Sequence, residues 1–314
     1  MTNTIAVDRP PPAADYPFAS HYVKVAGHNV HYIEEGAGQP VLFVHGNPTS
    51  SYVYRNVMPA VAEATNRRCL AIDLLGFGKS DKPANIDYTL PLFTEIITGF
   101  IEELRLRDII LVAEDWGGFL GSYVMTKHPD WFQSAVLMET FLWPMTFKED
   151  SEPVFVLPLK LMRSPLGAVF TRGMNIMVNK IIPEHCPMSE EALQAYKDAL
   201  PTFASRKALG TFPKLIPFDG KPAASQQFTL ELQAGLKNVT SPILWIKSDP
   251  GVIVSLMNPI GYGRLEELQQ TWPQMVVRDF GSGYHFLTEE RPDRVAEMIS
   301  DWVIENHLNG SHAD

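Results

Sequence analysis

The sequence has little cysteine, a deficit of basic residues and no long hydrophobic run. Its two cysteines, Cys69 and Cys186, stand far apart in 314 residues. A chain of this length can bury a sizeable core without a disulfide, so we expect none. Lys and Arg total 26 against 36 Asp and Glu, a formal net charge of −10, which argues against nucleic-acid binding and against docking to an anionic membrane. No run approaches the roughly 18 apolar residues of a membrane span.

The beginning of the chain lacks the charged start and apolar core of a secretory signal. Arg9 to Pro12 (R-P-P-P) lies in a polar lead-in, and we interpret residues 1–20 as a flexible proline-rich arm. The default expectation for the compartment is therefore the cytoplasm, with the periplasm as the alternative.

Short strand-like runs alternate with helical patterns along most of the chain. The runs are Tyr22–Val25, Asn29–Glu34, Val41–Val44, Cys69–Ile72, Ile109–Ala113, Ala135–Met138, Ile243–Ile246 and Met275–Phe280. The helical patterns are Leu90–Leu104, Gly117–Lys127, Leu265–Thr271 and Arg294–Glu305. The first two runs resemble a hairpin, and the alternation that follows predicts an α/β protein with a mostly parallel eight-stranded sheet and helices on both faces.

The alternation breaks between residues 141 and 217. Prolines recur there, with helix-compatible pieces such as Ser189–Leu200, where Glu190 and Glu191 suit a first helical turn. We interpret 141–217 as an inserted helical cap over the carboxyl edge of the sheet, with the core formed by 21–140 and 218–310. Chemistry collects at that edge in parallel sheets.

Asp115 occupies the position of a nucleophile. The run Ile109–Ala113 leads into Glu114-Asp115-Trp116-Gly117-Gly118 and then a helical pattern, the strand–turn–helix setting of a nucleophile elbow with its small flanking residues. A carboxylate is nucleophilic at neutral pH without a base and can form an ester with an sp³ carbon. The alternative is a helix N-cap, a role that Asp also favours.

Hydrolysis of such an ester requires a base, and His285 lies in a glycine-rich loop after the last strand-like run. An acid must orient this histidine. Glu139 and Asp249 both follow strand-like runs, and spacing alone does not choose between them. His45 precedes Gly46-Asn47-Pro48, a turn that can bring a backbone N–H group to the elbow. We expect the His45 ring to hold that loop.

Several segments resemble the haloalkane dehalogenases, α/β-hydrolase-fold enzymes, and within them the subgroup with an Asp–His–Glu triad. The matching segments are His45–Tyr52, Asp73–Pro83, Asp115–Gly117, Met138-Glu139 and Gly281–Phe286 with Glu289. The resemblance extends from about residue 20 to residue 305. H-G-N-P-T-S together with D-W-G is specific, whereas G-x-G-K-S-D-K-P is shared with related hydrolases.

The resemblance implies a role for each matching residue. Asp115 would displace halide and form an alkyl-enzyme ester. The side chains of Asn47 and Trp116 would hold the leaving halide, and His285 would activate the hydrolytic water. Within that subgroup the acid follows the earlier strand, which favours Glu139 over Asp249. The substrate would be a small halogenated alkane, with halide, water and a primary alcohol as the other participants, and no metal or organic cofactor is implied.

Three features depart from the family pattern: Glu114 before the nucleophile, extra residues at Ser255–Gly263, and an unusual Ser151–Pro165. We expect Glu114 to point away from Asp115, because an inward carboxylate would raise the pKa of Asp115. An apolar pocket between cap and core would suit small apolar halides. The residues that we expect to line it are Phe141, Trp143, Phe212, Pro213, Val252 and Phe286.

Three other functions fit parts of the sequence. An epoxide hydrolase uses the same triad but needs tyrosines from the cap, where Tyr196 is the one candidate. A luciferase-like oxygenase shares a segment similar to Lys247–Gly251. A non-catalytic receptor of this fold would have no need of an intact triad. For the assembly we expect a monomer or a small homo-oligomer, with no nucleic acid and no membrane as partner.

Overall fold

The computed structural model describes residues 16–151, 153–186, 188–253, 261–306 and 308. Most of the expected arm at 1–20, including Arg9 to Pro12, lies outside the described residues. The same holds for residues 255–260 of the expected extra segment.

The described residues form one eight-stranded sheet. Its strands are β1 (His21–Val25), β2 (His28–Glu35), β3 (Pro40–Val44), β4 (Arg68–Ile72), β5 (Ile109–Glu114), β6 (Phe132–Met138), β7 (Ile243–Pro250) and β8 (Met275–Gly283). They lie in the order β1-β2-β4-β3-β5-β6-β7-β8. β2 runs antiparallel to both β1 and β4, and the remaining pairs are parallel. The predicted sheet is confirmed.

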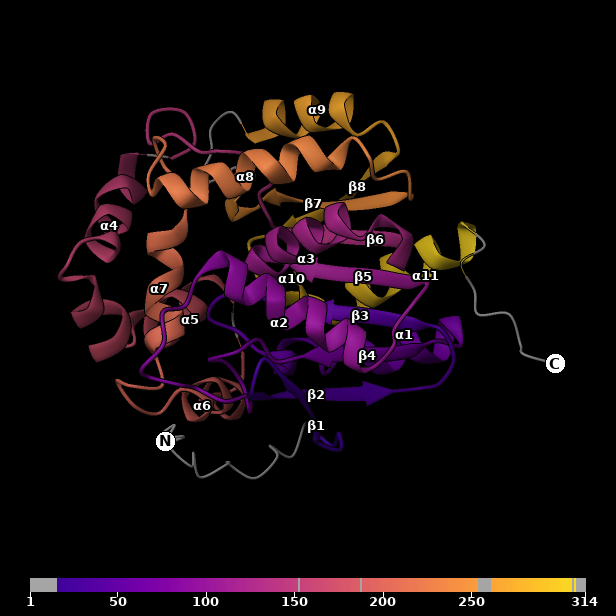
Figure 1. Cartoon of the computed structure of the whole chain (residues 1–314), viewed down its shortest axis with the longest axis horizontal. Helices are drawn as coiled ribbons and strands as arrows, with labels where there is room; N and C mark the ends of the chain where they lie inside the picture. The colour runs from indigo at the N-terminus through magenta and orange to yellow at the C-terminus, as the bar shows by residue number, and fades with distance from the viewer. Residues whose placement is uncertain (1–15, 152, 187, 254–260, 307, 309–314) are drawn as a thin grey trace.

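The central strands are buried because helices cover both faces of the sheet. All residues of β3 and β5 are buried, as their continuous apolar runs predict. Helices α2 (Leu90–Glu103), α3 (Asp115–Lys127) and α8 (Ala223–Leu236) pack side by side on one face (Figure 1). Helices α1 (Met58–Thr65) and α11 (Pro292–Glu305) pack together on the other. α9 (Gly261–Thr271) lies beside α8 in the same view.

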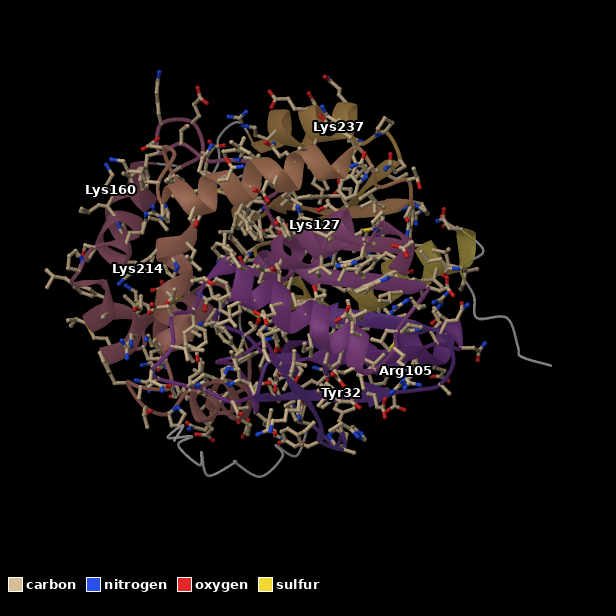
Figure 2. All side chains as sticks on the ribbon, viewed as in Figure 1. Tyr32, Arg105, Lys127, Lys160, Lys214 and Lys237 are labelled. Atoms are coloured by element: carbon tan, nitrogen blue, oxygen red, sulfur yellow. The ribbon has the colours of Figure 1, made fainter. Side chains whose placement is uncertain are left out.

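Between β6 and α8 the chain forms a separate group of short helices, which we call the inserted helices. They are α4 (Pro153–Arg163), α5 (Ile182–His185), α6 (Glu190–Ala199) and α7 (Lys207–Leu215), with two π-helical turns, η3 (Val169–Gly173) and η4 (Met177–Ile181). They lie together at the left of Figure 1. Lys160 and Lys214 mark them in Figure 2, at the opposite end of the molecule from Arg105.

The two ends of this insertion meet. Met145 and Phe218 form an isolated bridge, and the Asp219 N–H group donates to the Met145 carbonyl at 2.9 Å. The predicted helix at Ser189–Leu200 is α6, with the Ser189 hydroxyl accepting the Ala192 N–H group at 3.1 Å as an N-cap. The contact between the two ends supports the predicted boundaries of the insertion at residues 141 and 217. The exact boundaries stay a prediction.

β7 and β8 extend beyond their predicted ends. The pairing continues past a register shift at Lys247/Ser248 to Asp249↔Ser282 and Pro250↔Gly283. Asp249 therefore lies within a strand ladder rather than after it.

Two expectations about the whole chain can be compared with the structure. Cys69 and Cys186 are both buried and are not joined in a disulfide, as predicted. Among the described residues, no helix has both the length and the apolar character to cross a membrane.

Candidate active site

A strained turn presents Asp115 at the carboxyl end of β5. Asp115 has φ +46°, a left-handed conformation that costs free energy in a residue with a side chain and marks functional turns. The turn passes so close to β3 that a Cβ atom on Gly117 would lie 2.0 Å from the Val44 carbonyl oxygen. Glycine is therefore required at 117, as expected for a nucleophile elbow.

Backbone donors hold the Asp115 carboxylate in place. Asp115 Oδ2 accepts the Asn47 N–H group at 2.7 Å, from the loop after β3. Burial raises the pKa of Asp115, while His285 and the N–H groups of Asn47 and Trp116 act in the opposite direction. The side chain is 8% exposed. Two N–H groups aimed at one carboxylate form an oxyanion hole around that group.

The Glu139 carboxylate lies beside His285 and is held by three further donors. Glu139 Oε2 is 3.3 Å from His285 Nδ1 and accepts the N–H groups of Val252 and Ile253 at 2.8 and 3.0 Å. Ser248 donates its hydroxyl to Oε1 at 3.1 Å. The other sequence candidate, Asp249, is exposed on β7. The geometry thus favours Glu139 as the acid.

The carboxylates of Asp115, Glu139 and Glu114 act on the charge of His285. Burial lowers its pKa, but the hydrogen bond with Glu139 and the charges of Asp115, Glu139 and Glu114 raise the pKa to about 9. The neighbouring carboxylates therefore favour the protonated imidazole at neutral pH. Its Nε2 atom is the one left for other partners, because Nδ1 faces Glu139.

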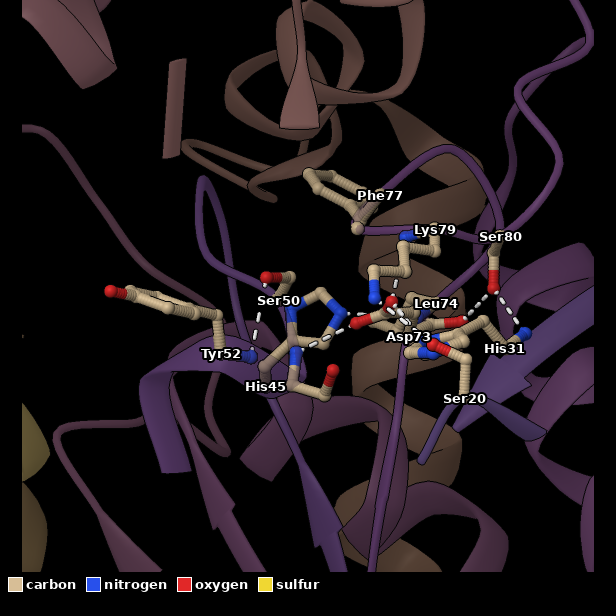
Figure 3. A network of polar contacts seen from close by, with 12 residues as sticks. Ser20, His31, His45, Ser50, Tyr52, Asp73, Leu74, Phe77, Lys79 and Ser80 are labelled. Carbon is tan, nitrogen blue, oxygen red and sulfur yellow. Dashed lines mark hydrogen bonds and ion pairs between the residues drawn. The ribbon is translucent and has the colours of Figure 1, made fainter. Parts of the chain in front are cut away.

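The His45 loop is held by a buried polar network around Asp73 (Figure 3). His45 Nε2 accepts the Leu74 N–H group at 3.0 Å. Asp73 accepts the Ser51 N–H group at 2.7 Å and lies 2.7 Å from His31 Nδ1. The His45 ring therefore fixes the loop that carries Asn47, as its position in the sequence indicated.

An apolar cavity of about 150 Å³ opens between these residues and the inserted helices. The core contributes Asn47, Pro48, Asp115, Trp116, Val252, Ile253, His285 and Phe286, and the insertion at 141–217 contributes Phe141, Met145, Leu159, Met162, Met177, Ile181, Pro213 and Ile216. Four of the expected pocket residues, Phe141, Pro213, Val252 and Phe286, are in this set.

Two expected pocket residues, Trp143 and Phe212, are not among the described residues that line the cavity. Trp143 stacks against Trp245 with ring centroids 6.5 Å apart. Phe212 is fully buried, stacks on Phe93 at 4.6 Å and packs behind Trp116 at 4.7 Å. Both are core residues, because aromatic partners occupy their faces. The prediction was wrong for these two.

The sequence did not reveal most of the lining from the inserted helices. Leu159 and Met162 come from α4, Met177 and Ile181 come from η4, and Ile216 directly follows α7. Their helical phase is too irregular to be read from a 3.6-residue period. The one available signal was their apolar character in a proline-rich segment.

Asn47 and Trp116 bring hydrogen-bond donors to an otherwise apolar cavity. Among the described residues, Asn47 Nδ2 has two long contacts, 3.5 Å to Met177 Sδ and 3.4 Å to the Leu209 carbonyl. These hydrogen bonds are weak. The Trp116 ring is fixed by Phe141 and Phe212. An indole N–H group and an amide are suitable donors for an anion in a dry site.

Glu114, the unusual neighbour of the nucleophile, is buried. Its Oε2 atom lies 3.4 Å from the Thr288 hydroxyl. Burial raises the pKa of Glu114 to about 8, and the charges of Asp115 and Glu289 add to this, against opposing effects of His285 and Thr288. The side chain is therefore mostly neutral at pH 7.

Tyr196 does not face the cavity. Its hydroxyl donates to Glu289 Oε1 at 2.5 Å, and no tyrosine is among the described residues that line the cavity. The tyrosine donors that an epoxide hydrolase needs are thus missing from the described site.

Comparisons with known proteins agree with this geometry. Residues 39–292 match the family model described as alpha/beta hydrolase fold. A haloalkane dehalogenase of Mesorhizobium japonicum is 32% identical over 302 residues, covering 94% of each chain, and one of Agrobacterium fabrum is 30% identical over 289 residues, covering 90% of each. The crystal structure of the haloalkane dehalogenase DatA from Agrobacterium tumefaciens C58 superposes with a TM-score of 0.85 at 29% identity, covering 94% of this chain and 99% of that one. The chain therefore belongs to the haloalkane dehalogenase family of the α/β-hydrolase fold.

Proposed function

We propose that this protein hydrolyses the carbon–halogen bond of small haloalkanes, giving a primary alcohol, halide and a proton. The observation that carries the proposal is a buried carboxylate, Asp115, at a nucleophile elbow on the floor of an apolar cavity. Asn47 and Trp116 supply donors at the same floor. A serine hydrolase would place a hydroxyl group there, and it would have no need of side-chain donors for an anion.

The first step is displacement of halide. One oxygen of Asp115 is held by the Asn47 N–H group at 2.7 Å, and the other attacks the carbon that bears the halogen. The carbon–oxygen bond forms as the carbon–halogen bond breaks, and the electron pair leaves with the halide. The side-chain N–H groups of Asn47 and Trp116 stabilise this charge as it develops.

The second step is hydrolysis of the ester. His285 Nε2 takes a proton from water, which attacks the carbonyl carbon of Asp115, and the backbone N–H groups of Asn47 and Trp116 stabilise the oxyanion. The bond between the carbonyl carbon and the alkyl oxygen then breaks, the alcohol leaves with the proton that His285 held, and the new carboxyl group loses its own proton, which restores the carboxylate. Glu139, 3.3 Å from Nδ1, orients the imidazole and stabilises its charged form.

Formation of the ester itself prepares the base. The charge of Asp115 is one of the causes that raise the pKa of His285 to about 9. An ester carries no charge, so the pKa of His285 falls in the alkyl-enzyme and a neutral imidazole becomes available. The imidazole therefore becomes able to accept a proton once the ester that it helps to hydrolyse has formed.

The cavity supports a substrate class of short haloalkanes without polar substituents. Its volume is about 150 Å³, and outside the catalytic group its lining is aliphatic, aromatic, proline and thioether. A hydroxyl or carboxylate on the substrate would be buried there without a partner, at a cost of about 1–3 kcal/mol or more.

Three further properties are part of the proposal. The reaction needs no metal or organic cofactor, since the nucleophile, base and halide donors are protein groups. The protein acts as a monomer or small homo-oligomer, with a cytoplasmic location. Sedimentation of the purified protein and fractionation of the source cells would test the last two.

The test is halide release by the purified protein from 1-bromobutane, 1-iodobutane and 1,2-dibromoethane, with Asp115→Ala as the matched variant. We expect release from at least one substrate and none above background with Asp115→Ala. Opening of an epoxide or light emission with coelenterazine, without halide release, would reject the proposed reaction and retain the fold.

A further inference from the structure

Glu289 joins three segments that are distant in the sequence. It belongs to the short helix α10 (Leu287–Glu290), and its side chain is 4% exposed. Arg55, after the turn η1 (Ser51–Tyr54), donates to both its oxygens at 2.5 and 3.0 Å. Tyr196 of α6 donates to Oε1 at 2.5 Å. One carboxylate thus connects the core, the inserted helices and α10.

Aromatic packing fixes both donors. The Arg55 guanidinium lies 3.9 Å from the centroid of the Tyr52 ring, and Tyr196 meets the same ring edge-to-face at 5.2 Å. Tyr196 is 2% exposed. A bidentate guanidinium–carboxylate pair that is buried and stacked has little freedom to rotate, so the position of the Glu289 carboxylate is set by its partners.

The helix that carries Glu289 begins directly after the catalytic histidine loop. The Glu289 and Glu290 N–H groups both donate to the Phe286 carbonyl, at 2.9 and 2.8 Å. The Glu290 carboxylate in turn accepts the N–H groups of Tyr284 and His285, at 2.9 and 3.1 Å. His285 and α10 therefore form one hydrogen-bonded unit, and a displacement of Glu289 is transmitted to the imidazole.

The imidazole is sensitive to such a displacement. The distance from His285 Nδ1 to Glu139 is 3.3 Å, already at the long end for a hydrogen bond to a carboxylate. A further shift of a few tenths of an ångström would weaken it.

We propose that Tyr196 is a positioning residue: through Glu289 and its partner Arg55, it ties the inserted helices to the loop of His285 and so sets the imidazole for ester hydrolysis. The proposal rests on the function proposed above. In that mechanism His285 acts only in the second step, so the two steps should respond differently to loss of the Tyr196 hydroxyl.

The test is Tyr196→Phe, which removes one hydroxyl and keeps the ring packing. In single-turnover experiments with 1-bromobutane, we expect the halide release of the first step to stay within about twofold of the wild type. Alcohol formation should slow by about tenfold, so halide appears before the alcohol and the alkyl-enzyme accumulates between the two steps. Glu289→Gln, which keeps an acceptor for Tyr196 but removes the ion pair, should show the same split in rates.

Tyr123→Phe is the matched control. The Tyr123 hydroxyl also donates to a glutamate, Glu231, at 3.1 Å, but on the exposed side of α3, and both steps should keep their wild-type rates. Equal slowing of both steps in Tyr196→Phe, or a raised KM alone, would overturn the positioning role. Absence of any halide release by the wild type would instead reject the proposed reaction.

Discussion

The sheet and the inserted helices differ in how regularly they are built. The central strands β3 and β5 are buried along their whole length, and their strand–turn–helix connections carry Asp115 and Asn47. The inserted helices are short, contain two π-helical turns, and expose large apolar side chains such as Leu157, at 74%. Both regions nevertheless meet at one cavity.

This difference in regularity between the sheet and the inserted helices corresponds to a difference in their roles. The proposed reacting groups come from the ends of buried strands and adjoining loops, whose positions are over-determined by the packing on both faces. Most of the cavity wall that would meet the rest of the substrate comes from the irregular segment, which can change without disturbing the sheet. We therefore infer that the core determines the reaction and that the inserted helices determine which haloalkane enters.

The largest effect should come from a core residue. Glu139→Gln should lower steady-state halide release by about 10³-fold, because His285 loses the charge that orients and stabilises it. Asp249→Asn, on the exposed end of β7, should stay within about twofold. The measurement is kcat at saturating 1-bromobutane, because the hydrolysis step that needs His285 limits kcat. The reverse result would make Asp249 the acid.

Loss of the indole N–H group of Trp116, the proposed halide donor, should have the next largest effect on turnover. Trp116→Phe keeps an aromatic ring but removes the N–H group, and we expect kcat to fall by about 10²-fold. Trp143→Phe is the control, since Trp143 packs against Trp245 outside the lining of the cavity. Similar losses in the two variants would mean that Trp116 acts through packing alone.

Substitutions in the inserted helices should change which haloalkane is preferred and should leave the reaction itself unchanged. Leu159 is 6% exposed and lines the cavity, whereas Leu157 on the same helix is exposed. Leu159→Ala should raise the ratio of kcat/KM for 1-bromohexane over 1-bromobutane by about tenfold, because it enlarges the apolar wall. Leu157→Ala should leave the ratio unchanged. An equal loss of kcat/KM for both substrates in Leu159→Ala would contradict the inference that the inserted helices determine which haloalkane enters.

The smallest effect on turnover is expected at Glu114. Its pKa in the folded protein is about 8, above the value in the unfolded chain, so the folded state retains a proton that the unfolded state loses. The wild type is therefore destabilised as pH rises from about 4.5 to about 8, at up to roughly 1.4 kcal/mol per pH unit. Glu114→Gln removes this dependence.

The measurement for Glu114 is the difference in Tm between Glu114→Gln and the wild type at several pH values. The difference should move in favour of the variant between pH 5 and pH 8 and then level off. Glu102→Gln, on an exposed position of α2, should show no such trend. A flat difference for Glu114→Gln would mean that Glu114 is ionised in the folded protein.

The sheet could be predicted from the sequence because each strand has a direct signal. Continuous apolar runs such as Val41–Val44 become buried strands, and their alternation with helical patterns predicts a mostly parallel sheet. The ends of β7 and β8 were missed, since Lys247 to Pro250 pair in the sheet despite their polar and proline residues. Pairing partners, rather than local preference, determine those ends.

The candidate site could be predicted where chemistry limits the choice of residue. Asp115, Asn47, Trp116 and His285 all line one cavity, as the motif and its resemblance predicted. The choice of Glu139 depended on the resemblance, and the contact with His285 came only with the structure. Trp143 and Phe212 were assigned wrongly, because an aromatic residue in a cap looks the same in sequence whether it faces a cavity or another ring.

The mass of the intact His285→Ala variant after incubation with 1-bromobutane shows directly whether Asp115 forms a covalent ester with the substrate. Without its base the enzyme should still be alkylated but not regenerated. We expect a stable species heavier by one butyl group, with the added mass on the peptide that contains Asp115, and no such species in Asp115→Asn/His285→Ala. Halide release without any adduct, or an adduct on another residue, would contradict the proposed mechanism.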